Sequence, residues 1–276
     1  MRLKYLGTAA YEGVPSLFCG CEVCRKSAAA GGKNLRSRSQ ALLNDDLLID
    51  FPADTVWHSQ KYGLDWNKIT DCIVTHSHSD HLYPKDVAML AKDYAHGTSK
   101  LHFHCGESGL RQLEEVAARE HIGERLELSL VEPFKPFTVC GGKYKVLPLP
   151  ADHAQDTSPV IYAIEGEGKR ILYAHDTGMF SESVWDGLRS FGRLDFVSLD
   201  CTGCLGLTSE WVHGHMSYRT GRMTIERMKQ EGVADDNTVF VLNHFSHNGG
   251  QTHDELAEAV KDKGVIVAYD GLTIEF

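Results

Sequence analysis

The sequence lacks a long apolar run, because no stretch approaches the roughly 18 residues that a membrane-spanning helix needs. The opening segment, MRLKYLGTAAYEG, has no apolar core followed by a small-residue cleavage site, so we expect no signal peptide. These two absences predict a protein that does not associate with the membrane and that stays in the cytoplasm. In that reducing compartment, the eight cysteines would be thiols or metal ligands and not disulfides.

Positive charge is also scarce. The chain has 28 Lys and Arg against 38 Asp and Glu, which gives a formal net charge of −10. An acidic surface of this kind argues against non-specific adhesion to nucleic acid, so we expect no nucleic-acid partner. A small phosphorylated substrate remains compatible, because a local cationic site can outweigh the distant field.

Low-complexity segments, charge blocks and proline-rich linkers are absent as well, so we expect one compact domain over residues 1–276. Hairpin-like patterns at 39–51, 137–153 and 158–178 alternate with helical patterns at 84–97, 107–123, 217–232 and 253–264. This order predicts an α+β fold in which two packed sheets are covered by helices. The oligomeric state is left open, with a homodimer as one option.

The segment THSHSDH crowds His76, His78, Asp80 and His81 at the end of a strand-like run. Imidazole nitrogens and carboxylate oxygens are both ligands for Zn, Mn or Fe. The segment offers too many ligands for one ion and too few for two.

The missing ligands are expected at the ends of other strand-like runs, namely at His153, Asp176 and His244. We assign one ion to His76, His78 and His153, and the second to Asp80, His81 and His244, with Asp176 bridging the two. A single histidine at a strand end is more often structural, so the prediction depends on the grouping.

A second pattern, FCGCEVC, places Cys19, Cys21 and Cys24 close together in a glycine-containing loop. Three thiolates need a fourth ligand to complete a tetrahedral zinc site, and His247, three residues after His244, is the candidate. A structural zinc here would connect the N-terminal loop to the loop that carries His244. The alternative is three unconnected thiols.

These motifs resemble a known family. THSHSDH with the downstream His153, Asp176 and His244 is similar to the metallo-β-lactamase superfamily, and GTAAYEGVPSLFCGCEVC is similar to its PhnP-type cyclic phosphodiesterases. The resemblance implies a four-layer αββα sandwich of two mixed sheets flanked by helices, with a dinuclear site at one edge. It also implies that a Cys3His zinc supports the loop beside that site.

The resemblance further implies the chemistry. Two divalent ions, Zn or Mn, would lower the pKa of a water between them and would bind the non-bridging phosphate oxygens. Asp80 would orient the resulting hydroxide, and Asp50 would orient a ligand imidazole from outside the ligand set. In the PhnP-type pattern a histidine just before a helix faces the metals, so His215 is the general acid or phosphate clamp that we expect, with His213 as the other candidate. The chain has HGHMS where that pattern usually carries an aspartate, so substrate detail could differ.

The function expected from these residues is a phosphodiesterase acting on a small cyclic phosphodiester, such as a phosphoribosyl 1,2-cyclic phosphate. One alternative is tRNA 3′ processing of the ribonuclease Z type, although the sequence shows no basic inserted arm. Another is a lactonase or β-lactamase, and a third is a non-enzymatic PqqB-like carrier. The carrier would lack the full dinuclear ligand set.

Overall fold

Two mixed sheets of seven strands each form the centre of the computed structural model, which describes residues 1–97, 100–206 and 213–276. The first sheet has the order β14-β1-β2-β3-β4-β5-β6. Its strands are β1 (Arg2–Gly7), β2 (Gln40–Leu43), β3 (Leu47–Ile49), β4 (Asp71–Ile73), β5 (Leu101–Cys105), β6 (Leu126–Leu130) and β14 (Thr273–Glu275). The second sheet has the order β13-β12-β11-β10-β9-β8-β7. Its strands are β7 (Phe137–Val139), β8 (Tyr144–Pro150), β9 (Val160–Gly166), β10 (Lys169–Ala174), β11 (Phe196–Asp200), β12 (Val239–Asn243) and β13 (Ile266–Val267).

Each sheet combines antiparallel and parallel pairing. The expected hairpins are present, because β2 pairs antiparallel with β3, β7 with β8 and β9 with β10. The pairs β3–β4, β4–β5 and β5–β6 are parallel in the first sheet, as are β10–β11, β11–β12 and β12–β13 in the second. Parallel strands end at the same edge of a sheet, so the residues that follow them are brought together there.

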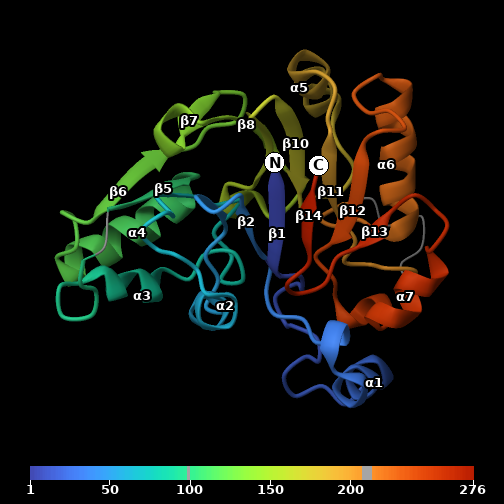
Figure 1. The fold of residues 1–276 in the computed structure, drawn as a ribbon, viewed down its shortest axis with the longest axis horizontal. Coiled ribbons are helices and arrows are strands. Elements are labelled where there is room, and N and C mark those ends of the chain that lie inside the picture. The colour runs from blue at the N-terminus through green and yellow to red at the C-terminus, as the bar shows by residue number, and fades with distance from the viewer. Residues whose placement is uncertain (98–99, 207–212) are drawn as a thin grey trace.

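The described residues form seven helices. They are α1 (Glu22–Ala30), α2 (Thr55–Tyr62), α3 (Pro84–Val87), α4 (Glu107–Glu120), α5 (Glu182–Phe191), α6 (Tyr218–Gln230) and α7 (His253–Ala259). Of these, α4, α5 and α6 pack on the outer faces of the sheets. Short 3-10 turns are η1 (Gly32–Asn34), η2 (Ala88–Leu90), η3 (Cys140–Gly142), η4 (Gln155–Thr157) and η5 (His247–Gly249). In Figure 1, α2 to α4 lie on one side of the strands and α5 and α6 on the other. None of the helices in the described residues combines the length and the apolar character needed to cross a bilayer.

Three apolar cores lie between these layers. One lies between the sheets and includes Tyr5, Tyr162 and Phe196, a second packs α5 and α6 on the second sheet, and a third packs α4 and its neighbours on the first sheet. Burial of this apolar surface is the main force that holds the layers together. The four-layer αββα sandwich expected from the sequence is therefore confirmed.

The helices differ from the sequence-based expectation in several places: α2 and α5 were not expected, and the helix expected over 253–264 ends at Ala259. Two further differences have a physical explanation. The helix expected over 84–97 ends after α3 and η2, since the segment 91–97 buries no side chain and so lacks the tertiary packing that stabilises a helix. The cysteine-rich segment, expected to be a loop, contains the helix α1. Its N-cap is Cys21, whose thiol accepts the Cys24 backbone N–H.

His58 on α2 makes the stability of the fold depend on pH. Its ring is buried, with Nδ1 2.6 Å from Gln40 Oε1 and Nε2 2.7 Å from Ser37 Oγ, and burial lowers the pKa of His58 to about 3. As the pH falls below about 6.5, the unfolded chain takes up a proton that the folded chain does not, and the free energy of unfolding decreases by up to about 1.4 kcal/mol per pH unit.

We therefore expect His58→Gln to lose less stability than the wild type when the pH is lowered from about 7 to about 5. Urea denaturation at each pH measures the difference, and His121→Gln, which changes an exposed histidine, is the control. Equal losses in the wild type and in His58→Gln would contradict the assignment.

Candidate metal centre

The candidate centre forms where the C-terminal ends of strands from both sheets meet. Asp50 follows β3, the segment 76–81 follows β4, Asp176 follows β10, and His244 follows β12. Asp50, Asp176 and His244 all have positive φ angles, of 68°, 49° and 62°. Non-glycine residues adopt this left-handed conformation uncommonly, so the surrounding structure must hold these three residues in place.

Three histidines form the first group of donors. His78 Nδ1 lies 2.9 Å from His76 Nε2 and 3.2 Å from His153 Nε2, and one nitrogen from each ring lies within 4.8 Å of the others. His76 is buried, whereas His78 and His153 are half-buried and reach the surface of a cavity. Three imidazoles held this close can ligate a single ion.

Asp80, His81, Asp176 and His244 form the second group, and all four are buried. Asp176 Oδ2 lies 2.6 Å from His81 Nε2 and 3.0 Å from His244 Nε2. The same oxygen is 3.7 Å from His76 Nε2, which belongs to the first group. Asp176 thus stands between the two groups, in the place that a bridging ligand would take.

We refer to these seven residues as the histidine–aspartate cluster. The structure brings together all seven positions that the sequence analysis proposed: His76, His78, Asp80, His81, His153, Asp176 and His244. Their assignment as metal ligands stays a prediction.

Residues outside the cluster orient its rings. Asp50 Oδ2 lies 2.7 Å from His81 Nδ1, while Asp50 Oδ1 accepts the Thr75 backbone N–H at 2.8 Å. Thr202 Oγ1 is 2.8 Å from His244 Nδ1, and the Gly214 carbonyl oxygen is 3.2 Å from His153 Nδ1. The contacts with Asp50, Thr202 and Gly214 occupy the outer nitrogen of each ring. The other ring nitrogen therefore faces the centre of the cluster, as is usual for ligand histidines.

The buried carboxylates perturb the titration of the histidines. Burial by itself lowers the pKa of His81 and His244, but the neighbouring carboxylates outweigh it. Asp50 and Asp176 raise the pKa of His81 well above its usual value, and Asp176 raises that of His244 to about 10. In His76, burial prevails and the pKa falls well below the usual value. The carboxylate-rich half of the cluster therefore favours positive charge.

One buried atom tests whether a divalent ion fits this arrangement. Asp176 Oδ2 is buried, and none of the described residues donates a properly oriented hydrogen bond to it. A buried carboxylate oxygen without a donor is costly unless a cation satisfies it. The mixed imidazole and carboxylate donors around it suit Zn, Mn or Fe, so the residues present fit divalent metal ions.

His215 and His213 have different surroundings. His215 Nδ1 lies 3.1 Å from Asp200 Oδ2 and 3.2 Å from Asp176 Oδ1, and the ring stacks against His244 with 5.6 Å between centroids. Burial lowers the pKa of His215, but Asp200 and Asp176 raise it above its usual value overall. His213 is 82% exposed and is held 2.8 Å from Asp152. His215 therefore lies at the cluster, whereas His213 lies on the surface.

Asp200 is a candidate residue that the sequence analysis did not single out. It is buried at the end of β11 and accepts the backbone N–H groups of Asp176, Thr202 and Met216 at 2.9–3.0 Å. It therefore fixes both the loop of Asp176 and the segment that carries His215. The signal was present in the sequence, because Asp200 ends a strand-like run just as Asp176 does.

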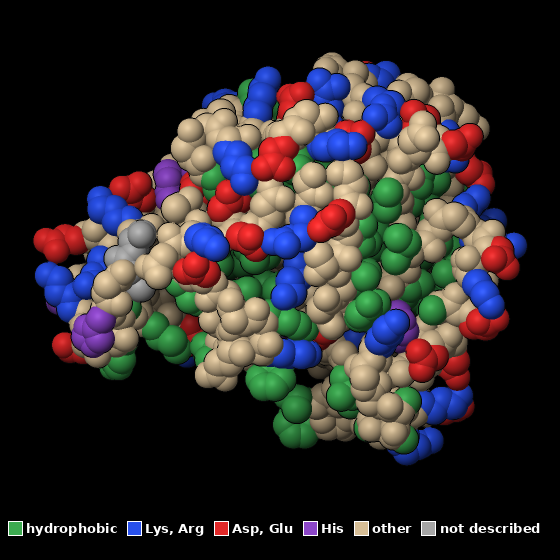
Figure 2. Space-filling model, viewed as in Figure 1, with side chains coloured by type: hydrophobic (Ala, Val, Ile, Leu, Met, Phe, Trp, Pro, Cys, Tyr) green, Lys and Arg blue, Asp and Glu red, His purple; other side chains and the backbone are tan. Residues whose placement is uncertain are grey.

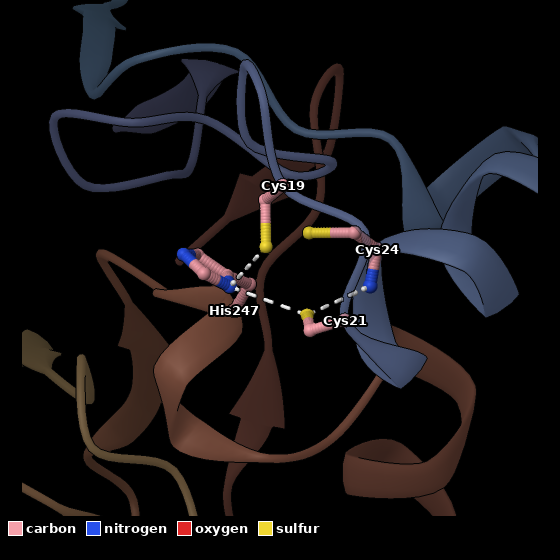
Figure 3. A group of neighbouring side chains, drawn as sticks. All are labelled: Cys19, Cys21, Cys24 and His247. Atoms are coloured by element: carbon pink, nitrogen blue, oxygen red, sulfur yellow. Dashed lines mark hydrogen bonds between the residues drawn. The ribbon is translucent and has the colours of Figure 1, made fainter.

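A separate group of four residues, the Cys3His group, comprises Cys19, Cys21, Cys24 and His247 (Figure 3). His247 Nδ1 lies 3.6 Å from Cys19 Sγ and 3.4 Å from Cys21 Sγ. The hydrogen bond from the Cys24 backbone N–H, and after it the hydrogen bond with His247, lowers the pKa of the Cys21 thiol to about 6. Burial raises the pKa of the Cys24 thiol to about 11. Three sulfur donors and one imidazole suit a tetrahedral zinc ion.

A cavity of about 430 Å³ opens above the histidine–aspartate cluster. Its lining includes His78, Asp80, His153, Asp176, His215 and His244, together with Tyr11, Glu12, Ser246 and Asn248 from the loops near the Cys3His group. None of the described residues that line it is a lysine or an arginine. The volume falls in the range of small-molecule sites.

The four-layer fold and the histidine–aspartate cluster at its edge define a class of proteins that bind divalent metal ions between two sheets. The chain belongs to the beta-lactamase superfamily, because residues 48–245 match the family model described as the beta-lactamase superfamily domain. Members of this superfamily are mainly metal-dependent hydrolases.

Solved structures of the same fold cover the whole chain. Zn(2+)-bound PqqB from Methylobacterium extorquens is 17% identical, with a TM-score of 0.76 over 100% of both chains. A diphosphatase from the PhnP family is 23% identical, with a TM-score of 0.74 over 100% of this chain and 97% of that one. The short form of human tRNase Z is 16% identical, with a TM-score of 0.65 over 100% and 99%. At these identities the similarity shows the fold and not the reaction, and a search of curated proteins gave no match.

Proposed function

We propose that this protein is a metal-dependent phosphodiesterase that hydrolyses a small, cyclic phosphodiester. The observation that carries the proposal is the position of Asp176 between two complete groups of donors, with one oxygen 2.6 Å from His81 and 3.7 Å from His76. His76, His78 and His153 would hold one divalent ion, and Asp80, His81 and His244 the other. Such a pair of ions supplies an activated water and binds the phosphate oxygens.

The lining of the cavity concentrates positive charge at the histidine–aspartate cluster. The described lining residues contribute no lysine or arginine, so positive charge would come from the ions and from His215. This charge would balance the single negative charge of a diester phosphate bound at the cluster, and any further phosphate group of the substrate would have to lie toward solvent. A volume of about 430 Å³ admits a sugar phosphate, whereas a folded tRNA would have to bind mainly outside it. On the face shown in Figure 2, basic and acidic side chains are interspersed.

A hydrolysis screen with metal-reconstituted protein tests the proposal. The substrates are phosphoribosyl 1,2-cyclic phosphate, bis-(p-nitrophenyl) phosphate, a nucleoside diphosphate, a lactam panel and a tRNA precursor. We expect kcat/KM for a phosphodiester to exceed that for the other classes by at least about tenfold. Preference for a diphosphate, lactam or tRNA precursor would replace the proposed substrate class. Absence of turnover, together with one zinc ion per chain and no dinuclear occupancy, would favour a carrier.

We further propose His215 as the general acid that protonates the leaving oxygen. Asp200 holds its Nδ1 side, and the raised pKa of His215 favours the protonated ring. General acids contribute about 10²–10⁴-fold to rate, and the contribution shrinks when the leaving group needs no proton. His215→Gln should therefore lower kcat by at least about 100-fold for an alkyl leaving group, and much less for p-nitrophenolate.

His213→Gln is the matched control, because it changes an exposed histidine in the same segment. We expect this variant to keep its kcat with both leaving groups. A loss in His215→Gln that is equal for alkyl and aryl leaving groups would indicate a phosphate clamp and not an acid.

A further inference from the structure

A third group of metal-ligating side chains lies at the opposite end of the first sheet. Asp71 begins β4, whereas the ligand segment of the histidine–aspartate cluster follows the end of that strand. His102 and His104 are two residues apart on β5 and so share one face of the sheet, and Asp71 pairs with His102 across the two strands. One donor atom from each of the three residues lies within 4.8 Å of the others.

The geometry around Asp71 is not explained by hydrogen bonding alone. His104 Nε2 lies 2.8 Å from Asp71 Oδ1, which is a good hydrogen bond. His102 Nδ1 lies 3.9 Å from the same oxygen, which is too long for a hydrogen bond. The two rings lie face to face, with 3.9 Å between centroids and 33° between planes. An ion would take the place of the His104–Asp71 hydrogen bond and use all three donor atoms, which lie within 4.8 Å of one another.

The outer atoms of this group are already bonded. Asp71 Oδ2 accepts the Thr70 hydroxyl at 2.7 Å and the Cys140 backbone N–H at 3.0 Å, so Oδ1 is the oxygen that faces the histidines. His102 Nε2 lies 2.8 Å from Ser129 Oγ, which directs Nδ1 inward. The Phe137 ring stacks on His104 at 5.1 Å between centroids. Contacts of this kind fix ligand orientation and tautomer in metal sites.

The site can be reached from solvent. Asp71 and His102 line an open cavity of about 690 Å³, whereas His104 is buried, and the His102 side chain is 28% exposed. Glu127 Oε2 lies 3.8 Å from His102 Nδ1 and adds a carboxylate at the rim. Lys100 also lines the cavity, but its ammonium is paired with Glu127 Oε1 at 3.0 Å, which reduces its repulsion of a bound cation.

We propose that Asp71, His102 and His104 bind one divalent transition-metal ion, with its remaining coordination positions facing the cavity. Two imidazoles and one carboxylate suit Zn²⁺, Ni²⁺ or Cu²⁺ and do not suit Mg²⁺ or Ca²⁺, which prefer oxygen ligands. The site is separate from both the histidine–aspartate cluster and the Cys3His group. It does not depend on the proposed phosphodiesterase activity.

Counting metal ions per chain tests this site. Full-length protein is dialysed against buffered Zn²⁺, and bound zinc is measured by mass spectrometry in the wild type, in His102→Asn and in His96→Asn, which changes an exposed histidine elsewhere. We expect His102→Asn to bind about one ion fewer per chain, and His96→Asn to bind as much as the wild type. Hydrolytic activity should be the same in all three. An unchanged zinc content in His102→Asn would overturn the proposal.

If His102→Asn loses more than one ion per chain, the substitution has disturbed the fold as a whole. A second variant then tests the site. Ser129→Ala removes only the hydroxyl beside His102 Nε2. Its zinc titration should show one class of sites weakened by about 10–100-fold and the others unchanged. A titration identical to that of the wild type would overturn the proposal.

Discussion

Replacing Asp176 with asparagine is expected to lower kcat/KM for hydrolysis by at least about 10³-fold, since two-metal stabilisation of the transition state is worth several kcal/mol. Asp176 Oδ2 is within 3.0 Å of both His81 and His244, and the carboxylate also faces His76. Asparagine has nearly the same shape but carries no charge. The variant should therefore keep the fold while losing the negative charge that connects the two groups of donors.

Zinc or manganese content, measured together with activity, separates this explanation from misfolding. We expect Asp176→Asn to bind less metal in the histidine–aspartate cluster, to keep the zinc of the Cys3His group, and to retain its circular dichroism spectrum. Asp262→Asn, which removes an exposed carboxylate, is the control and should behave as the wild type. Full activity in Asp176→Asn would show that the cluster does not hold the catalytic ions.

Substitution of Asp176 is also expected to lower the activity more than substitution of the residues that surround the cluster. Within the cluster, Asp50 contacts His81 alone, through the outer nitrogen Nδ1 at 2.7 Å. Contacts of that kind typically change metal affinity or activity by about 10–100-fold, which is less than the effect expected for Asp176. This order of effects is a property of the geometry and not of the residue type, because both residues are buried aspartates.

The predictability of this site from sequence depends on how local each signal is. THSHSDH could be interpreted directly, because four donors stand within six residues. Asp176 and His244 could be proposed because each follows an apolar run, and parallel strands bring such positions to one edge. Asp200 follows the same rule, but its role as an acceptor for three backbone N–H groups depends on loops that only the folded structure shows.

Other features depended on long-range packing. The group of Asp71, His102 and His104 arises from the register of β4 against β5, which pairs residues 31 positions apart. The helical pattern over 84–97 was misleading, because none of the side chains in its second half is fully buried. Local periodicity predicts an amphipathic helix, whereas the presence of a partner surface decides whether that helix is stable.

Replacing Cys21 with serine is expected to remove the part of the stability of this protein that depends on a zinc ion in the Cys3His group. Cys21 Sγ is the thiol 3.4 Å from His247, and it also caps α1 by accepting the Cys24 backbone N–H. A structural zinc ion contributes its binding energy directly to folding. A loss of about 4 kcal/mol would lower Tm by about 8–16 °C in a chain of this size.

Thermal denaturation with added zinc and with a chelator measures this effect in each protein. The wild type should melt at a higher temperature with zinc than with chelator. Cys21→Ser should show a smaller difference, because only ions at the other proposed sites would remain. Cys204→Ser is the control, because it changes a buried cysteine outside the Cys3His group, so any loss of Tm should be the same under both conditions.

Loss of zinc from the Cys3His group should also weaken substrate binding in the cavity. Glu12 lines it and lies 3.7 Å from His247 Nε2, so loss of the zinc would free the loop that carries Glu12. We therefore expect Cys21→Ser to raise KM for the phosphodiester more than it lowers kcat. An equal response to zinc in Cys21→Ser and in the wild type would contradict a zinc site at the Cys3His group.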